Sequence, residues 1–272
     1  MKEIYISIIL CCYNSQSFLI ETLNSIKNQT YKKFELIIIN DGSTDNTKKL
    51  IKEFINENSE IKVKFINQKN SGLSKSRNVA ISFSKYDYIA LLDHDDLWVD
   101  NKLEKQVDHI DKNKDCDLFF SDFYYLNVSQ VEKTRFEVAR NKDLYNPVKL
   151  NLNYINCFKE LATKGCFIGT SSVIFNKNIL NKENYFDTRY KFLTDYIFFL
   201  EVAKTKNFYC SDEILSYWRS HINQATSKMS KIHSYELNKL YIKFYFSNLL
   251  NLIDKFIIIK KHLKLLIKLV IY

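Results

Sequence analysis

Short apolar runs that alternate with amphipathic segments dominate the first hundred residues. Each run is aliphatic or β-branched and is bounded by polar residues, which predicts a buried strand. The predicted strands are residues 5–11, 34–39, 63–66 and 88–92. The segments between them repeat apolar residues at helical spacing, which predicts helices at 18–28, 47–56 and 73–84. Strands that alternate with helices through short polar turns indicate an α/β fold, with a mostly parallel central sheet flanked by helices.

The loops after these strands hold the first candidate ligand-binding residues. Right-handed crossovers bring the carboxyl ends of parallel strands to one edge of the sheet, where ligands of open α/β sheets bind. There, Tyr13 is expected to flank a base, Asp41 to accept a hydrogen bond from a base or ribose, and Arg77 to reach a phosphate. Two simpler interpretations stay open: Asp41 as a turn residue before Gly42, and Arg77 as a solvated charge on its helix.

The strand at 88–92 ends in the acidic segment Asp93-His94-Asp95-Asp96. Crowded carboxylates repel one another, so either one of them is protonated or a cation lies between them. Carboxylate oxygens suit Mg²⁺ or Mn²⁺, which commonly complete their coordination with water and substrate phosphate. The segment therefore predicts a divalent metal site for a phosphorylated ligand. The alternative is an acidic loop that starts a helix, with Asp96 or Asp100 as its N-cap.

The second half of the chain is predicted to contain a helix at 102–112, strands at 117–125 and 214–218, and an irregular polar segment at 128–150. An apolar, β-branched run at 166–175 carries the turn Gly169-Thr170-Ser171-Ser172 at its centre. Small residues inside a strand indicate close approach by a ligand or by another part of the backbone.

Asp195, Arg219 and His221 are the polar candidates of this half. Asp195 precedes a strongly apolar helix, where a carboxylate either complements the helix dipole or, partly desolvated, acts as a general base. His221 follows Arg219 in a loop rich in serine and threonine, which leaves open both a site role and the structural role that a lone histidine usually has.

The net charge of +9 is concentrated at the end of the chain. Residues 228–272 hold nine lysines against Glu236 and Asp254, so a nucleic-acid groove across the main domain is not expected. Lys260, Lys264 and Lys268 share one face of a predicted helix, while Leu263, Leu266, Leu269 and Val270 lie away from them. Such a basic amphipathic helix suits the surface of an anionic membrane. Packing on the preceding domain or on a second copy of the chain is the alternative.

The six cysteines form no C-x-x-C pair. They are interpreted as small buried residues in a reducing compartment, not as a disulfide or zinc framework. The N-terminal apolar run is too short for a signal peptide and is expected to be the first buried strand.

Six segments, in this order, resemble the inverting GT-A glycosyltransferases of family 2, which build bacterial surface polysaccharides. They are ISIILCCYN, ELIIINDGSTDNT, NSGLSKSRNVAI, YIALLDHDDLW, FLTDYIFF and YWRSHINQAT, and the resemblance covers roughly residues 4–226. DDLWVDNKLEKQ and NCFKELATKGCFIGTSSVIF are further similar to O-antigen glycosyltransferases.

The resemblance implies a role for each candidate residue. Asp93-His94-Asp95 occupies the D-x-D motif, in which Asp95 would bind Mn²⁺ or Mg²⁺ and Asp93 would contact the ribose or the metal shell. Asp195 would be the catalytic base, with Thr194 in place of the usual glutamate. The remaining implied roles are nucleotide binding, most often of uridine, by Tyr13, Asp41 and Arg77, diphosphate contact by Arg219, and completion of the metal or diphosphate site by His221.

The implied activity is transfer of a sugar, with inversion, from a UDP-hexose or UDP-N-acetylhexosamine to a hydroxyl of a glycan or lipid-linked acceptor. The implied organisation is a GT-A catalytic domain over 1–227, with a nucleotide-binding half at about 1–100 and an acceptor-binding half at about 101–227. Residues 228–272 would be the helical tail, on the cytoplasmic face of a bacterial plasma membrane. A catalytically impaired sugar-nucleotide or carbohydrate-binding protein is the alternative. A dinucleotide-dependent oxidoreductase is not expected, because the first turn lacks G-x-G-x-x-G.

Overall fold

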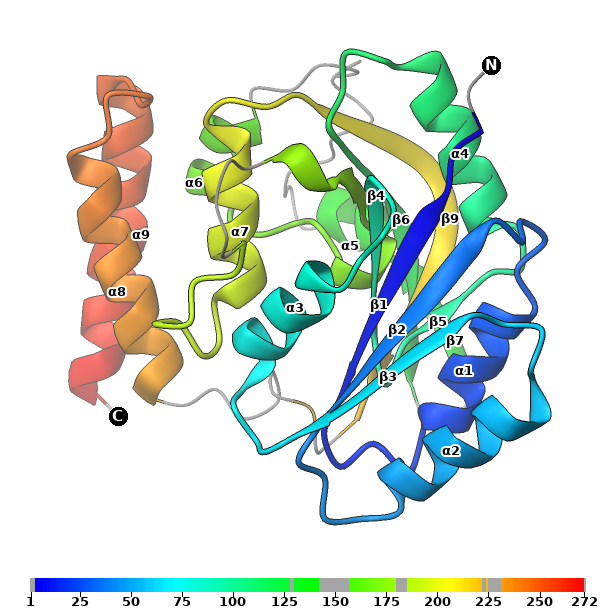
Figure 1. Ribbon diagram of the computed structural model, residues 1–272. Coiled ribbons are helices and arrows are strands. Elements are labelled where there is room, and N and C mark those ends of the chain that lie inside the picture. Colours follow the sequence, from blue (N-terminus) through cyan, green and yellow to red (C-terminus); the bar gives the residue numbers. More distant parts are fainter. Residues whose placement is uncertain are drawn as a thin grey trace.

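A nine-stranded mixed sheet forms the centre of the protein (Figure 1). The computed structural model describes residues 3–127, 130–141, 157–179, 185–221, 224 and 231–271. The strands are β1 (Ile6–Cys12), β2 (Phe34–Asp41), β3 (Val63–Gln68), β4 (Tyr88–Asp93), β5 (Leu97–Trp98), β6 (Leu118–Asn127), β7 (Gln130–Thr134), β8 (Ile174–Asn176) and β9 (Phe208–Ser220). Their order in the sheet is β3-β2-β1-β4-β8-β6-β9-β5, and β7 pairs with β6.

The sheet changes character at β4. The strands β3, β2, β1 and β4 pair in parallel, as their short polar turns and intervening helices predict. Beyond β4, the short strand β8 runs antiparallel to both β4 and β6, and β5 runs antiparallel to β9. The predicted α/β fold is confirmed, and the sheet is mixed because of these short antiparallel strands.

Alternate residues of the buried strands face two separate cores. On β1, Ile6, Ile8 and Leu10 pack on one face of the sheet and Ile9 and Cys11 on the other, as the two-residue period of a strand requires. The first face is covered by α1 (Leu19–Lys27), α2 (Thr47–Glu57) and α4 (Lys102–Lys112). The second face is covered by α3 (Leu73–Ser82), α6 (Cys157–Lys164) and α7 (Thr194–Ala203).

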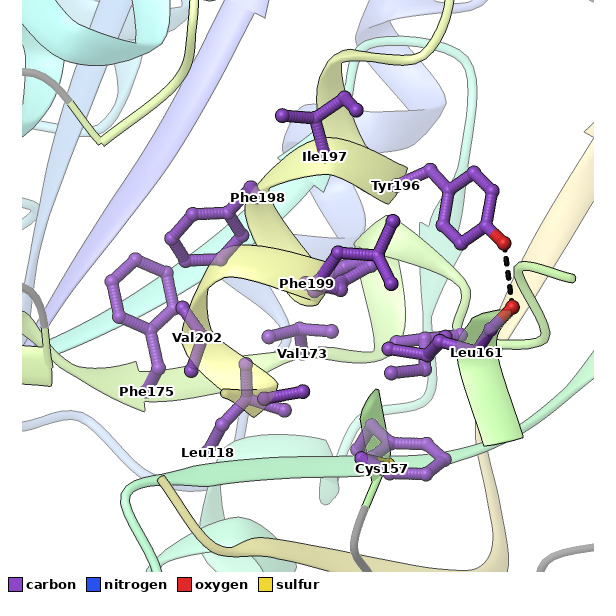
Figure 2. Packing of buried hydrophobic residues seen from close by; sticks show 14 of the residues in the cluster. Leu118, Cys157, Leu161, Val173, Phe175, Tyr196, Ile197, Phe198, Phe199 and Val202 are labelled. Carbon is purple, nitrogen blue, oxygen red and sulfur yellow. Dashed lines mark hydrogen bonds between the residues drawn. The ribbon is translucent and has the colours of Figure 1, made fainter. Parts of the chain in front are cut away.

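Helix α7 is buried on almost every side (Figure 2). Phe198 and Phe199 are fully buried, and the hydroxyl of Tyr196 donates a hydrogen bond to the carbonyl of Leu161 in α6 at 2.5 Å. A helix that is apolar all round belongs in a core, which explains the unbroken apolar sequence that follows Asp195.

The C-terminal part forms a helical hairpin of α8 (Lys231–Tyr245) and α9 (Leu252–Ile271) beside α6 and α7 (Figure 1). No helix in the described part of the chain is long and apolar enough to cross a bilayer. The predicted domain boundary between residues 227 and 228 lies outside the described residues.

Several predicted elements differ from the structure. The run 166–175 forms a short 3₁₀ helix, η2 (Thr170–Ser172), and only the three-residue strand β8. The segment 128–150 is not irregular throughout, since it contains β7 and α5 (Arg135–Asn141), while residues 142–150 lie outside the described residues. All six cysteines are free, but Cys166 is exposed, so the prediction of burial is wrong for that residue.

Gly42 lies where the chain leaves β2, with φ of +74°, and a Cβ atom there would lie 2.6 Å from the amide nitrogen of Asn70. We expect Gly42→Ala to lower the free energy of unfolding by about 1–3 kcal/mol or more, because it adds a backbone clash to an unfavourable φ. Gly165→Ala is the matched control, since φ is +96° there and no atom lies within 4 Å of the added Cβ. Urea denaturation of both variants measures the effect, and equal losses would contradict the clash.

Candidate active site

The predicted acidic residues of β4 and α7 line one cavity of about 540 Å³. Its lining includes Asp93, Asp95, Thr194, Asp195 and Arg219. Two other cavities, of about 640 and 680 Å³, contain none of the predicted site residues. The cavity that unites the carboxylates is therefore the candidate active site, although it is the smallest of the three.

Arg77 forms ion pairs with two of these carboxylates, those of Asp93 and Asp195. Its side chain is 2% exposed, so it is not a solvated charge. Nη2 donates to Asp93 Oδ1 at 2.6 Å, and Nη1 forms a short ion pair with Asp195 Oδ1. Burial alone would lower the pKa of Arg77, but the charges of Asp195 and Asp93 outweigh it and raise that pKa above its ordinary value. Arg77 thus remains a cation that fixes the end of β4 to the start of α7.

Asp195 lies in the first turn of α7 and is held through both carboxylate oxygens. In addition to the Arg77 contact, Oδ2 accepts a hydrogen bond from the hydroxyl of Thr170 at 2.9 Å. Both interpretations of its position agree with this geometry, since it lies near the positive end of the helix dipole and lines the cavity. Oδ1 also accepts a hydrogen bond from the hydroxyl of Thr194 at 3.3 Å, so Oδ2 is the oxygen that retains a lone pair for a proton from a ligand.

The segment that leads into α7 is held from the C-terminal hairpin. The backbone amides of Lys191, Phe192 and Leu193 donate to the carboxylate of Glu236 in α8 at 2.7, 3.1 and 3.1 Å. Glu236 is buried. Sequence reasoning missed this residue, and it also missed Thr170, whose only signal was the small polar turn inside an apolar run.

Asp95 contacts His221, with 2.9 Å between Asp95 Oδ2 and His221 Nε2. Arg219 holds the same loop, because its Nε donates to the carbonyl of Asp95 at 2.9 Å and its Nη2 donates to Glu21 Oε2 at 2.6 Å. Arg219 therefore lines the cavity as a braced, largely buried cation.

Asp96 is buried beneath the loop and does not cap a helix. It accepts hydrogen bonds from Ser171 Oγ at 2.6 Å and from the amide of Arg219 at 2.9 Å. Burial, with the charges of Asp95 and Asp93, raises its pKa well above the ordinary value. Since Asn101 precedes the first turn of α4, the N-cap interpretation of Asp96 and Asp100 is wrong.

A divalent cation fits the Asp95–His221 pair. Carboxylate oxygen is a ligand suited to Mg²⁺ and Mn²⁺, and imidazole nitrogen is a ligand of several first-row transition-metal ions. Among the described residues, no group of three or more His, Cys, Asp or Glu side chains gathers to hold a metal. The pair therefore suits an ion that takes its remaining ligands from water and a bound diphosphate, as Mg²⁺ usually does.

Tyr13 and Asp41 lie at the ends of β1 and β2 and do not line this cavity. Tyr13 is exposed. Asp41 is buried and accepts hydrogen bonds from the side chain of Gln68 and the amides of Ser71 and Gly72, at 2.7, 2.9 and 2.8 Å. Asp41 thus holds the loop that leads into α3, which is the turn role left open above.

Burial raises the pKa of Asp41, but these hydrogen bonds outweigh burial and leave its pKa below the ordinary value. We expect Asp41→Asn to lower the free energy of unfolding at pH 7 by about 1.5–3 kcal/mol, because an amide replaces a charged acceptor. A depressed folded pKa stabilises the fold above the unfolded value of about 3.9 and loses that contribution as the pH falls. The difference between wild type and variant should therefore shrink below about pH 4.

Urea denaturation between about pH 3 and pH 7 measures this difference. Asp108→Asn, which removes an exposed carboxylate from α4, controls for the change in net charge. If Asp41→Asn has the stability of the wild type at pH 7, the loop does not depend on the Asp41 charge.

Comparisons with known proteins agree with the resemblance. The profile of "Glycosyl transferase family 2" matches residues 7–182. A similar relative is the Escherichia coli "UDP-Glc:alpha-D-GlcNAc-diphosphoundecaprenol beta-1,3-glucosyltransferase WfgD", 29% identical over 212 residues, which are 76% of this chain and 73% of that protein. Another is an uncharacterised glycosyltransferase of Rickettsia typhi, 28% identical over 85% of this chain and 69% of its own length.

Solved structures show the same fold. S. aureus TarS in complex with UDP-GlcNAc has a TM-score of 0.71 at 18% identity, over 96% of this chain and 72% of that chain. The Pyrobaculum calidifontis mannosyltransferase PcManGT, in complex with GDP-Man and Mn²⁺, has a TM-score of 0.65 at 14% identity, over 94% and 68%. These structures share the GT-A fold of this protein, and because the family profile matches more than half of its sequence, the chain belongs to glycosyl transferase family 2.

Proposed function

We propose that this protein is an inverting glycosyltransferase of bacterial cell-surface polysaccharide synthesis. The donor is a UDP-hexose or UDP-N-acetylhexosamine, and the acceptor is a hydroxyl of a glycan or a lipid-linked saccharide. The observation that carries the proposal is that Asp195 and Asp95 line one cavity, so one bound sugar nucleotide can contact both. The relative WfgD, named for transfer from UDP-Glc to a diphosphoundecaprenol-linked sugar, and TarS, solved with UDP-GlcNAc, support this donor and acceptor.

In this mechanism Asp195 takes the proton from the acceptor hydroxyl. The resulting oxygen attacks the anomeric carbon as the bond to the diphosphate breaks, so the configuration inverts in one displacement. Arg77 and Thr170 keep the Asp195 carboxylate oriented towards the cavity that it lines. Asp95 and His221 would hold Mn²⁺ or Mg²⁺, which supplies positive charge to a departing diphosphate. Arg219 positions Asp95, and Asp93 would contact the ribose from the cavity wall. Tyr13 and Asp41, at the ends of β1 and β2, would contact the nucleotide where it extends beyond this cavity.

Donor hydrolysis tests the proposal. The full chain is incubated with UDP-glucose, UDP-galactose and their N-acetyl forms, with and without Mn²⁺, and release of UDP is measured. We expect release from at least one donor only with metal, and its loss in Asp95→Ala. Metal-dependent binding of UDP-sugars in a thermal-shift assay, without hydrolysis or transfer, would instead support the catalytically impaired binding protein.

We further propose that residues 1–227 form the catalytic domain, with halves that meet near residue 100, and that the hairpin docks it on an anionic membrane from the cytoplasmic side. Helix α9 packs on the core through Ile258, which is fully buried, while His262 contacts Asn238 and Tyr245 of α8. On the opposite side, Phe256 and Leu263 are 56% and 54% exposed, and further exposed apolar side chains continue this face. The apolar face of α9 comprises Leu252, Ile253, Phe256, Ile259, Leu263, Leu266 and Ile267.

Exposed lysines lie along the apolar face of α9, among them Lys260 and Lys264. An apolar helix face bordered by lysines matches the boundary between anionic headgroups and acyl chains. We expect Phe256→Ser/Leu263→Ser to lose sedimentation with vesicles that contain phosphatidylglycerol. Ile20→Ser, which removes an exposed apolar side chain from α1, is the matched control. If wild type and the double variant sediment equally, α9 does not dock on lipid.

A further inference from the structure

An aromatic wall closes the side of the cavity that the mechanism above does not use. Phe123 and Tyr125 lie two residues apart on β6 and therefore share one face of the sheet. Trp218 of β9 is the direct partner of Tyr125 in the parallel pair. Ring centroids are 5.4 Å apart both for Phe123 with Tyr125 and for Tyr125 with Trp218, in edge-on arrangements. All three rings line the cavity that contains Asp195, and we call them the aromatic wall.

The aromatic wall is fixed relative to the base. A Cβ atom on Gly169 would lie 2.6 Å from the ring of Phe123, so glycine is what allows this ring to lie against η2. The next residue is Thr170, whose hydroxyl holds Asp195. Because Gly169 and Thr170 are adjacent, the aromatic wall and the carboxylate that takes the proton are positioned by the same short turn.

Two cations that line the same cavity lack a carboxylate partner among the described residues. Arg135 and Lys191 both line the cavity. Arg135 donates to the carbonyl of Cys166 at 3.3 Å, and Lys191 lies four residues before Asp195. Within the described part of the chain neither forms an ion pair, whereas Arg77 and Arg219 are paired with carboxylates. An unneutralised guanidinium beside a cavity suits a phosphate group.

We propose that the aromatic wall, with Arg135 and Lys191, is the acceptor subsite, and that it takes a sugar whose anomeric carbon carries a phosphate or diphosphate. This inference rests on the proposed transferase function. The faces of the rings offer the apolar surface that a pyranose ring covers, and the few convergent cations fix its orientation. The donor diphosphate is assigned to the Asp95–His221 end of the cavity. Arg135 and Lys191 would therefore recognise a second anion. A lipid-linked diphosphate and a soluble sugar phosphate share this chemistry.

Binding to the full chain, saturated with UDP and Mn²⁺ so that the donor end is filled, tests the inference. The probes are N-acetylglucosamine α-linked through a diphosphate to an undecyl chain, the same sugar and chain joined by an ether, and N-acetylglucosamine 1-phosphate, each titrated by calorimetry. We expect the diphosphate probe to bind at least tenfold more tightly than the ether. If N-acetylglucosamine 1-phosphate binds as tightly as the diphosphate probe, the site is assigned to soluble sugar phosphates. If it binds more weakly than the diphosphate probe, the site is assigned to lipid-linked saccharides. Equal affinity of the diphosphate and ether probes, or no binding of any probe, would overturn the inference.

Variants assign the contacts to residues. Arg135→Gln should reduce the preference for the diphosphate probe at least tenfold, and Trp218→Leu should weaken the diphosphate and ether probes by similar factors. Arg189→Gln, which removes an arginine that pairs with Asp187 outside this cavity, is the control that keeps the wild-type preference. A wild-type preference in Arg135→Gln would overturn the assignment of the phosphate to Arg135. Donor hydrolysis is measured separately, so failure of the transferase function and failure of the acceptor subsite give different results.

Discussion

Replacement of Asp195 by asparagine is expected to lower kcat for sugar transfer by about 10²- to 10⁴-fold, the range that a general base usually contributes. The amide has nearly the shape of the carboxylate but does not accept the acceptor proton. Asp95 and His221 are unchanged in the variant, so metal-dependent binding of the donor should persist. The contact with Thr170 identifies the carboxylate orientation that the variant would preserve.

Radiolabelled sugar transfer measures kcat, and calorimetry with the UDP-sugar measures donor binding. Asp187→Asn is the control, because Asp187 is a carboxylate that pairs with Arg189 and lines a different cavity. Wild-type transfer by Asp195→Asn would remove Asp195 from the role of base. Loss of both transfer and donor binding would instead mean that the substitution disturbs the nucleotide side.

Replacement of Arg77 by methionine is expected to lower the free energy of unfolding by about 3–5 kcal/mol at pH 7, because it removes the cation from a buried ion pair. Asp93 and Asp195 would then face each other without the guanidinium that separates them. Transfer activity should fall with stability, since the base loses one of the groups that orient it.

The pH dependence separates this charge effect from a simple loss of packing. Burial already raises the pKa of Asp93, and in Arg77→Met nothing opposes that shift. An aspartate whose folded pKa exceeds its unfolded value destabilises the fold at higher pH, and protonation relieves the cost. The stability difference should therefore narrow as the pH falls from about 7 to about 5. Arg77→Lys retains a charge and should cost less, whereas a difference that is constant with pH would indicate packing alone.

The sequence predicted the parallel part of the sheet well. The four strands and three helices between residues 5 and 93 each lie within a few residues of their predicted bounds. The strand β5 was missed, and β8 is much shorter than the strand predicted at 166–175. Two or three residues carry no period, and the direction of such strands depends on pairing with distant segments. The mixed character of the sheet followed from these short strands.

The site was predictable as a set of residues but not as a set of contacts. Asp93 and Asp95 were predicted to lie at the sheet edge because they follow a parallel strand, and they lie at the carboxyl end of β4. The contacts of Arg77 join residues 16 and 118 positions apart in the sequence, which no local pattern reveals. The aromatic wall was missed for the same reason, because it requires the pairing of Tyr125 with Trp218 across two strands.

The carboxylate of Glu236 connects the C-terminal hairpin to the helix that carries Asp195. Force on α8, whether from a lipid surface, a tethered substrate or a neighbouring protein, would reach the reaction centre through this acidic side chain and through the ring contact of His233 with Phe192. A chain cut at residue 228 would consequently expose three amides at the start of α7, and its behaviour would report catalytic damage together with any loss of anchorage.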